Sequence, residues 1–128
     1  DTHLMNIEQL RHHCLSLPHV SEGMPFGDGY IVYKVVDRIF AILVPDGRAS
    51  RLSLKCDPDW AEELRASYTA IIPGYHLNKK HWNTLLLEEH LPPTLLTKLI
   101  RHSWNEAAAK LTKTVRTQLS ITPLPIDD

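Results

Sequence analysis

The chemically richest part of the chain is residues 73–82, which read PGYHLNKKHW. Lysine side chains attract phosphate, aromatic rings stack on nucleobases, and a Pro-Gly pair fixes a bend in the backbone. We therefore expect Lys79, Lys80 and His81 to offer donors to phosphates, with Tyr75 and His76 shaping the same site. The pattern predicts binding rather than catalysis.

A structural role is the alternative for several side chains of this segment. Trp82 opens an apolar run, so we expect it in the core, and Tyr75 could pack over the Pro-Gly turn instead of stacking on a base. Two adjacent lysines are common in solvated loops, and Asn78 suits a turn that needs a positive φ. Composition alone supports both interpretations.

A second basic set consists of Lys34, Arg48, Arg51 and Lys55. Residues 51–56 (RLSLKC) alternate with period two, which places Arg51 and Lys55 on one face of a strand and Leu52, Leu54 and Cys56 on the other. Lys34 joins them if its strand is a neighbour. The pattern predicts an exposed basic sheet face that could follow phosphates, or one whose long side chains only keep an open face soluble.

Metal, cofactor and catalytic chemistry have little support in the sequence. His76 and His81 are five residues apart, which is not the spacing of a helical metal site, and no third ligand has motif spacing. Cys56 is expected to point inward, and Asp57 suits a helix cap better than a catalytic acid. We expect no metal, no cofactor and no enzymatic activity.

Composition limits how the protein could meet a partner. The chain has 128 residues and a formal net charge of -1, so the whole molecule does not attract nucleic acid or anionic membrane, and binding needs a local patch. No apolar run approaches the roughly 20 residues of a membrane helix, and no secretory signal is visible. We expect a cytoplasmic monomer, rather than an obligate oligomer, with Cys14 and Cys56 reduced and buried.

Hydrophobic periodicity and turn residues predict the elements that position these side chains. Asn6 with Gln9 three residues later predicts a capped helix, and Asp57-Pro58 predicts the start of another. The expected helices are 6–17, one beginning at 57–58, and 94–118; the expected strands are 30–36, 39–44, 51–56, 69–72 and 82–87; residues 21–29 are expected to form a loop.

Strands grouped between helices predict an α+β fold, a two-layer sandwich with an antiparallel sheet and the helices on one face. We expect a single domain over residues 5–119 and a C-terminal tail over 120–128. Residues 1–4 could be an addition that precedes a natural start at Met5.

Four stretches give the chain a resemblance to a known family: residues 25–27 (PFG), 32–35 (VYKV) with 39–41 (IFA), 54–58 (LKCDP), and 73–84. From Met5 to about Leu119 the chain resembles the MmcQ/YjbR family of small bacterial proteins. The resemblance implies a CyaY-like (frataxin-like) fold and a DNA-binding role with a pair of β-hairpin wings. The chain departs from the family at residues 36–38, which lack the glycine often found in that hairpin turn.

Nucleic-acid binding is the function we expect, with DNA contacted weakly or non-specifically. The expected contact residues are Lys79, Lys80, His81, Arg48, Arg51, Lys55, Tyr75 and His76. The alternative is a module that binds a small ligand or a protein through residues 73–82, with an enzyme third. An iron role, which the frataxin-like fold suggests, is not expected, because Glu8 is the one acidic residue of the first helix.

Overall fold

The computed structural model describes residues 6–126. Its strands are β1 (Val20–Gly23), β2 (Ile31–Val35), β3 (Arg38–Val44), β4 (Arg51–Lys55), β5 (Ile71–Pro73) and β6 (Trp82–Leu86). Its α-helices are α1 (Ile7–Ser16), α2 (Pro58–Ser67), α3 (Pro93–Ala108) and α4 (Lys113–Gln118), and its 3-10 turns are η1 (Gly47–Ala49) and η2 (Leu87–Glu89). The prediction for residues 1–4 concerns a segment outside the described residues.

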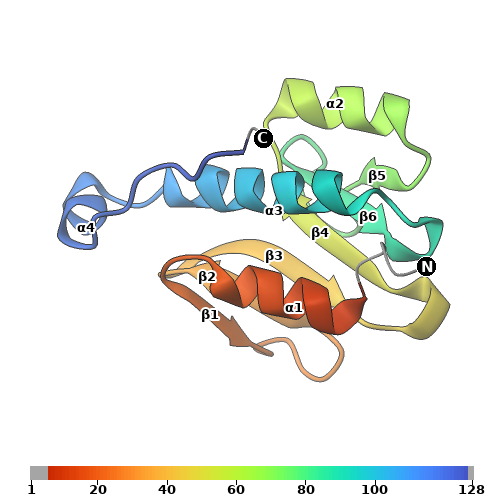
Figure 1. Cartoon of the computed structure of the whole chain (residues 1–128), viewed down its shortest axis with the longest axis horizontal. Helices are drawn as coiled ribbons and strands as arrows, with labels where there is room; N and C mark the ends of the chain where they lie inside the picture. The colour runs from red at the N-terminus through yellow and green to blue at the C-terminus, as the bar shows by residue number, and fades with distance from the viewer. Residues whose placement is uncertain (1–5, 127–128) are drawn as a thin grey trace.

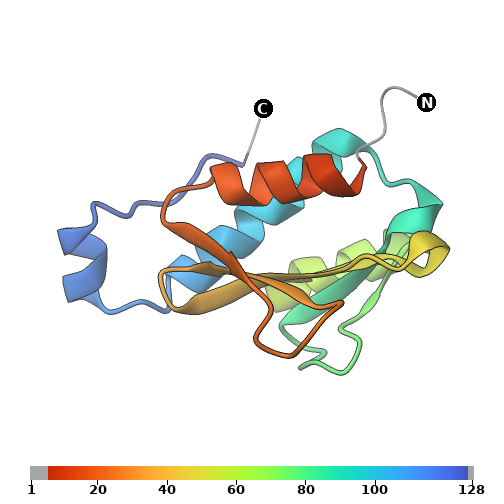
Figure 2. The ribbon, with the colours of Figure 1, turned by 90° about the horizontal axis from the view of Figure 1, so that it is seen from below.

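The strands form one antiparallel sheet in the order β1-β2-β3-β4-β6-β5 (Figure 1). Helices α1 and α3 lie on one side of this sheet, and the β1–β2 and β5–β6 loops extend from the other side (Figure 2). Helix α2 lies on the same side of the sheet as α1 and α3. Its Ala61 carbonyl accepts a hydrogen bond from the Asn83 side chain, and Asn83 is on the inward-facing side of β6 together with Leu85. The predicted α+β sandwich with its helices on one face is confirmed.

The hydrophobic core lies between the sheet and these helices. Leu10 and Cys14 of α1 and Ile100 and Trp104 of α3 are buried against inward-facing strand residues such as Leu52. The Trp104 indole N–H donates to the Pro18 carbonyl at 3.0 Å, so its one polar atom is satisfied. Packing of this kind fixes the sheet from one side.

Both cysteines lie in this core, as expected. Cys14 is 1% exposed and Cys56 is 4% exposed, and both are free thiols. Burial is the main reason that the pKa of each thiol is raised to about 12. The neutral thiol therefore dominates at physiological pH, and neither group suits a nucleophile.

Local chemistry explains the helix starts that the sequence predicted. Asn6 accepts a hydrogen bond from the Gln9 backbone while the Gln9 side chain accepts from the Asn6 backbone, which completes the expected capping box. Asp57 accepts from the Trp60 backbone at 3.1 Å, and Pro58 occupies the first turn. The Asp57 assignment as a cap is therefore confirmed.

Two expectations about the elements are wrong. Residues 20–23, placed partly in a loop, form the edge strand β1. The helix expected over 94–118 is two helices, because Thr112 caps a new one by accepting from the Val115 backbone. The C-terminal segment over residues 120–126 lies against the domain: Asn105 exchanges two hydrogen bonds with the Leu124 backbone, and Ile121 and Leu124 pack on the core.

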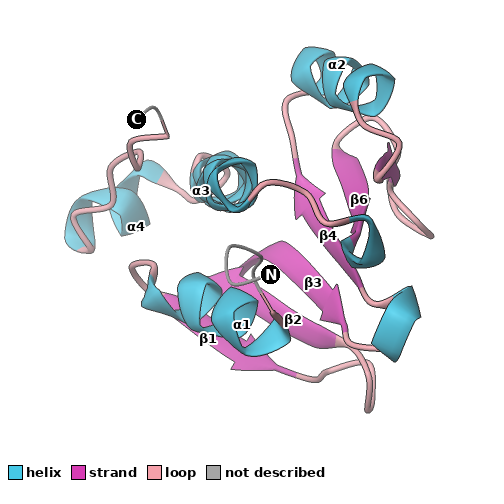
Figure 3. Ribbon diagram, turned by 45° about the vertical axis from the view of Figure 1, so that its right-hand side comes forward, coloured by secondary structure: helices cyan, strands magenta, loops and turns pink. Residues whose placement is uncertain are grey.

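Ser103 of α3 connects the two halves of the sheet. Its hydroxyl accepts from the Lys55 backbone N–H at 2.8 Å and donates to the Phe40 carbonyl, so it stands between β4 and β3. Direct pairing of these strands ends one residue earlier, at Ala41 and Leu54. Beyond that point β4 and β6 turn away from β1–β3, and α3 lies in the angle between the halves (Figure 3).

Within residues 6–126, no helix has both the length and the apolar character needed to cross a membrane.

Candidate nucleic-acid interface

The side of the sheet that points away from α1 and α3 is called the outer face below. Alternation from the buried Leu52 and Leu54 places Arg51, Ser53 and Lys55 of β4 on it. The β1–β2 loop (residues 24–30) and the β5–β6 loop (residues 74–81) both rise on this side (Figure 2). The predicted shared face of Arg51 and Lys55 is confirmed.

The outer face is not an open wet surface along its whole length. Ser53 and Thr84 are buried, with their hydroxyl oxygens 2.8 Å apart, and the Tyr75 backbone N–H donates to Thr84 Oγ1 at 2.9 Å. The β5–β6 loop therefore folds back over the middle of β4 and β6. Sequence alternation identified the face of Ser53 correctly but could not foresee that a later loop covers it.

Each of the two basic residues of β4 lies beside an aromatic ring. The Arg51 guanidinium carbon is 4.7 Å from the centroid of Tyr75, and the Lys55 ammonium is 5.8 Å from the centroid of Trp82. The expectation that Trp82 belongs to the core is wrong, because the register pairs it with Lys55 on the outer face, where it is half-buried. The outer face thus carries two cation–aromatic pairs, one toward each end of β4.

The β5–β6 loop is held in shape by its own polar groups. Lys79 Nζ donates to the Gly74 carbonyl at 2.9 Å, and Asn78 Oδ1 accepts from the backbones of Lys80 and His81. A Cβ at position 74 would lie 2.8 Å from the Trp82 Cβ, so only glycine fits there. One of the three N–H donors of Lys79 is therefore used inside the loop, whereas the side chains of Lys80 and His81 are exposed.

Tyr75 and His76 lie together at the start of this loop. Their ring centroids are 4.0 Å apart, and His76 has a left-handed backbone with φ 58°. Tyr75 is 49% exposed although it also contacts Arg51. The Tyr75 ring already contacts the His76 ring and the Arg51 guanidinium, so less of its surface is free for base stacking. Its main effect is to orient the Arg51 guanidinium.

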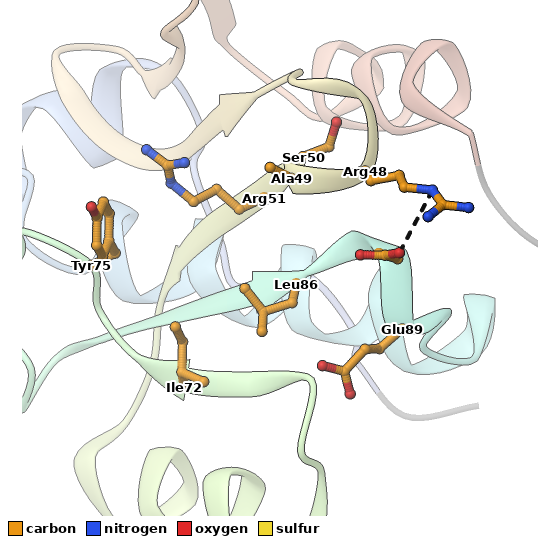
Figure 4. A pocket seen from close by; sticks show the side chains of 9 residues that line it. Arg48, Ala49, Ser50, Arg51, Ile72, Tyr75, Leu86 and Glu89 are labelled. Carbon is orange, nitrogen blue, oxygen red and sulfur yellow. Dashed lines mark ion pairs between the residues drawn. The ribbon is translucent and has the colours of Figure 1, made fainter.

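Arg48 lies apart from the other basic residues. It belongs to η1, its side chain is 93% exposed, and its Nε is 3.9 Å from a Glu88 carboxylate oxygen. Glu88 and Glu89 both line the same cavity as Arg51, which has a volume of about 310 Å³ (Figure 4). The acids make this end of the face electrically mixed rather than uniformly basic.

Two further basic residues, Arg38 and Lys110, lie near Lys55, and the sequence interpretation missed both. Burial, followed by the positive charges of Arg38 and Lys110, lowers the pKa of Lys55, and Glu106 acts in the opposite direction. His81 and Trp82 line a cavity of about 220 Å³ together with Lys55 and Lys110. The hairpin register could have placed Arg38, but no sequence signal brings the end of α3 to this site.

Lys34 is on the outer face but at a distance along the sheet. It lies on β2 and lines a cavity with Val32 and Met24 beside the β1–β2 loop. Strand β3 separates it from β4, and the outer-facing β3 residues Ile42 and Val44 are half-buried. Within residues 6–126, no group of three or more His, Cys, Asp or Glu side chains is placed to hold a metal ion.

Comparison with known proteins places the chain among bacterial relatives. The YjbR family model matches residues 15–106. Uncharacterized protein YbdF of Escherichia coli O157:H7 is 36% identical over 77% of this chain and 81% of its own length. Uncharacterized protein YjbR of Escherichia coli K12 is 31% identical over 80% of this chain and 87% of its own length.

Solved structures agree with this placement. The crystal structure of Deinococcus radiodurans protein DR2400, a DUF419 domain, has a TM-score of 0.86 and 40% identity, covering 94% of this chain and 91% of that one. A Pseudomonas syringae protein has a TM-score of 0.71 and 26% identity, covering 80% of this chain and 99% of that one. The match to the family model and the similarity to these relatives agree with the four stretches that resemble MmcQ/YjbR proteins. They show that the chain belongs to the YjbR family.

Proposed function

We propose that the outer face binds nucleic acid, with DNA as the expected form, through phosphate contacts that carry little sequence information. The observation that carries this proposal is the placement of Arg51 and Lys55 on one face, each beside an aromatic ring. Basic side chains interleaved with aromatic rings are typical of surfaces that bind single-stranded nucleic acid. The contact residues are Arg51, Lys55, Lys80 and His81, with Arg38 and Lys110 beside them and Lys34 farther along the sheet.

The charge distribution supports a local and weak interaction. The net charge of -1 gives no long-range attraction, so affinity depends on the few basic groups that reach the phosphates. Three or four phosphate contacts correspond to a slope of log affinity against log salt of about -3 to -4 for duplex DNA. Non-specific dissociation constants at physiological salt then fall at about 10⁻⁴ to 10⁻⁶ M.

Salt-titrated binding to short single-stranded and duplex DNA tests the proposal. Replacing Arg51 and Lys55 together with alanine removes two phosphate contacts, so the slope should flatten by about two units. Replacing Lys80 alone should flatten it by about one unit, whereas Lys79→Ala also removes the hydrogen bond to Gly74 and should loosen the loop.

The matched control is the double variant Lys98→Ala and Lys113→Ala, which changes net charge equally on α3 and α4. Its salt slope should equal that of the parent. An unchanged slope in the Arg51 and Lys55 double variant would show that the outer face is not the binding surface.

A small-ligand module is the second candidate, and the cavity of about 310 Å³ beside Tyr75 favours it. Apolar Ile72 and Leu86 and charged Arg51 and Glu89 line this cavity, as ligand sites commonly combine an apolar wall with a few polar groups. If the parent protein binds neither form of DNA in a salt-dependent way, this second function replaces the first.

A further inference from the structure

The cavity beside Tyr75 has an apolar wall, with Arg51 at one end and Glu88, Glu89 and Arg48 at the other (Figure 4). Ile72 of β5 and Leu86 of β6 form the apolar wall, which the neighbouring strands hold in place. The volume of about 310 Å³ suits one planar ring system, and it lies at the small end of the range for ligand sites. An apolar wall beside a cavity of this size can cover one face of a single unstacked nucleobase.

The positive end of the cavity is formed by Arg51. Its guanidinium lies over Tyr75 at 4.7 Å, and among residues 6–126 it forms no ion pair or side-chain hydrogen bond. A stacked guanidinium is oriented before a ligand arrives, and its paired N–H groups match two phosphate oxygens. This end is therefore suited to the phosphate of the nucleotide.

The other end is formed by Glu88, Glu89 and Arg48, so its two carboxylates outnumber its one guanidinium. One oxygen of Glu89 accepts from the Thr69 hydroxyl at 2.7 Å, which leaves its other oxygen as an acceptor. Glu88 has only a long contact of 3.9 Å with Arg48. Because the two carboxylates outnumber the single guanidinium of Arg48, this end on balance attracts a hydrogen-bond donor more than a carbonyl oxygen.

We propose that this cavity receives one splayed base of a single strand and favours a base with an exocyclic amino group, cytosine over uracil. The inference rests on the nucleic-acid binding proposed above and adds base selectivity to it. Cytosine presents an amino donor at the position where uracil presents a carbonyl acceptor, and carboxylates accept from the cytosine amino group. In a duplex the cytosine amino group already donates a hydrogen bond to its paired base, so the cavity selects single-stranded nucleic acid.

Competition between oligodeoxycytidine and oligodeoxyuridine of equal length tests the inference, at slightly alkaline pH where cytosine is neutral. The two bases differ at C4, which carries an amino group in cytosine and a carbonyl in uracil, and at the adjacent N3, which is an acceptor in cytosine and an N–H donor in uracil. Their backbones are identical, so phosphate contacts cancel. The parent protein should bind oligodeoxycytidine at least about five-fold more tightly. The double variant Glu88→Gln and Glu89→Gln should lose this preference, because an amide can also donate to the uracil carbonyl.

The matched control is Glu62→Gln with Glu63→Gln, which makes the same charge change on the exposed side of α2 and should keep the preference. Methyl NMR shifts of Ile72 and Leu86 on adding oligodeoxycytidine should locate the base in the cavity. Equal, salt-dependent binding of both oligomers, or a preference that survives the Glu88 and Glu89 changes, would overturn the inference and leave the proposed function standing. Absence of binding to either oligomer, even at low salt, would overturn both.

Discussion

Single residues of this protein hold backbone conformations that their side chains do not favour. Val36, in the two-residue turn between β2 and β3, has φ 59°. A β-branched residue in the left-handed region is strained, because its Cβ approaches the following carbonyl. The hairpin therefore keeps a tight turn without the glycine whose absence stood out in the sequence, at a cost in stability.

Val36→Gly should stabilise the protein by about 0.5–1 kcal/mol, because relief of the left-handed strain exceeds the added entropy of glycine. Little apolar burial is lost, since Val36 is 37% exposed. Urea unfolding followed by circular dichroism measures the change. Asp37→Gly is the control, because Asp37 does not have a positive φ, and it should bring no gain. A loss of stability in Val36→Gly would show that the turn is not strained.

Part of the candidate site could be predicted residue by residue. Alternation alone placed Arg51 and Lys55 together, because a strand fixes which side chains share a face. The position of Trp82 could not be predicted, since its face depends on the register with β4, which only the folded sheet determines. The hydrogen bond from Lys79 to the Gly74 carbonyl depends on the backbone path of the folded loop, and that path could not be predicted from the loop sequence.

At the level of elements, strong local signals predicted structure and weak ones did not. The capping box of α1 and the Asp-Pro start of α2 were visible because their side chains bond their own backbones. Strand β1 (VSEG) has no apolar alternation, and its stability comes from pairing with β2. The separation of α3 and α4 was hidden because the apolar spacing continues across Thr112, whose capping role needs the fold.

Ser103→Ala should lower the free energy of unfolding by about 1–3 kcal/mol, because the Lys55 N–H and the Phe40 carbonyl lose their shared buried partner. Chemical denaturation of the variant and of the exposed control Ser67→Ala measures the difference. If Ser103→Ala lowers the free energy of unfolding no more than Ser67→Ala does, the Ser103 hydroxyl is not needed to hold β3 and β4 together.

At the scale of the whole molecule, one charged network ties α1 to the edge of the sheet. Glu22 of β1 accepts two hydrogen bonds from Arg11 at 3.1 Å and one from the buried Tyr33 hydroxyl at 2.6 Å. Hydrogen bonds from Arg11 and then Tyr33 lower the pKa of Glu22. The ionised form is favoured in the folded protein, which makes overall stability depend on pH.

Glu22→Gln should lower the melting temperature at neutral pH by about 3 to 6 °C. A depressed folded-state pKa gives stability that is full above the ordinary value of 4.5 and is lost as the pH falls below it. The difference between parent and variant should therefore shrink below that pH in scanning calorimetry. Glu8→Gln, which removes the more exposed partner of Arg11, should change little. A difference that is constant with pH would contradict this role for Glu22.

Fold class was the most predictable property of the whole molecule. Helices flanking grouped strands indicated the α+β sandwich, because an antiparallel sheet with one apolar face needs a covering layer. The CyaY-like fold implied by the family resemblance, and the DNA-binding role that accompanies it, stay predictions. Strand alternation and core packing determine neither the relationship to CyaY-like proteins nor the ligand that the protein binds.

The Ser103 junction has a consequence for the length of ligand that the protein could cover. The β1–β2 loop belongs to one half of the sheet and the β5–β6 loop to the other, and the hydroxyl between Phe40 and Lys55 sets the angle of the halves. If this junction holds the angle between the halves, the span between the loops stays constant. A strand that contacts both loops would occupy a constant footprint, with the same number of nucleotides per protein at low and at high occupancy.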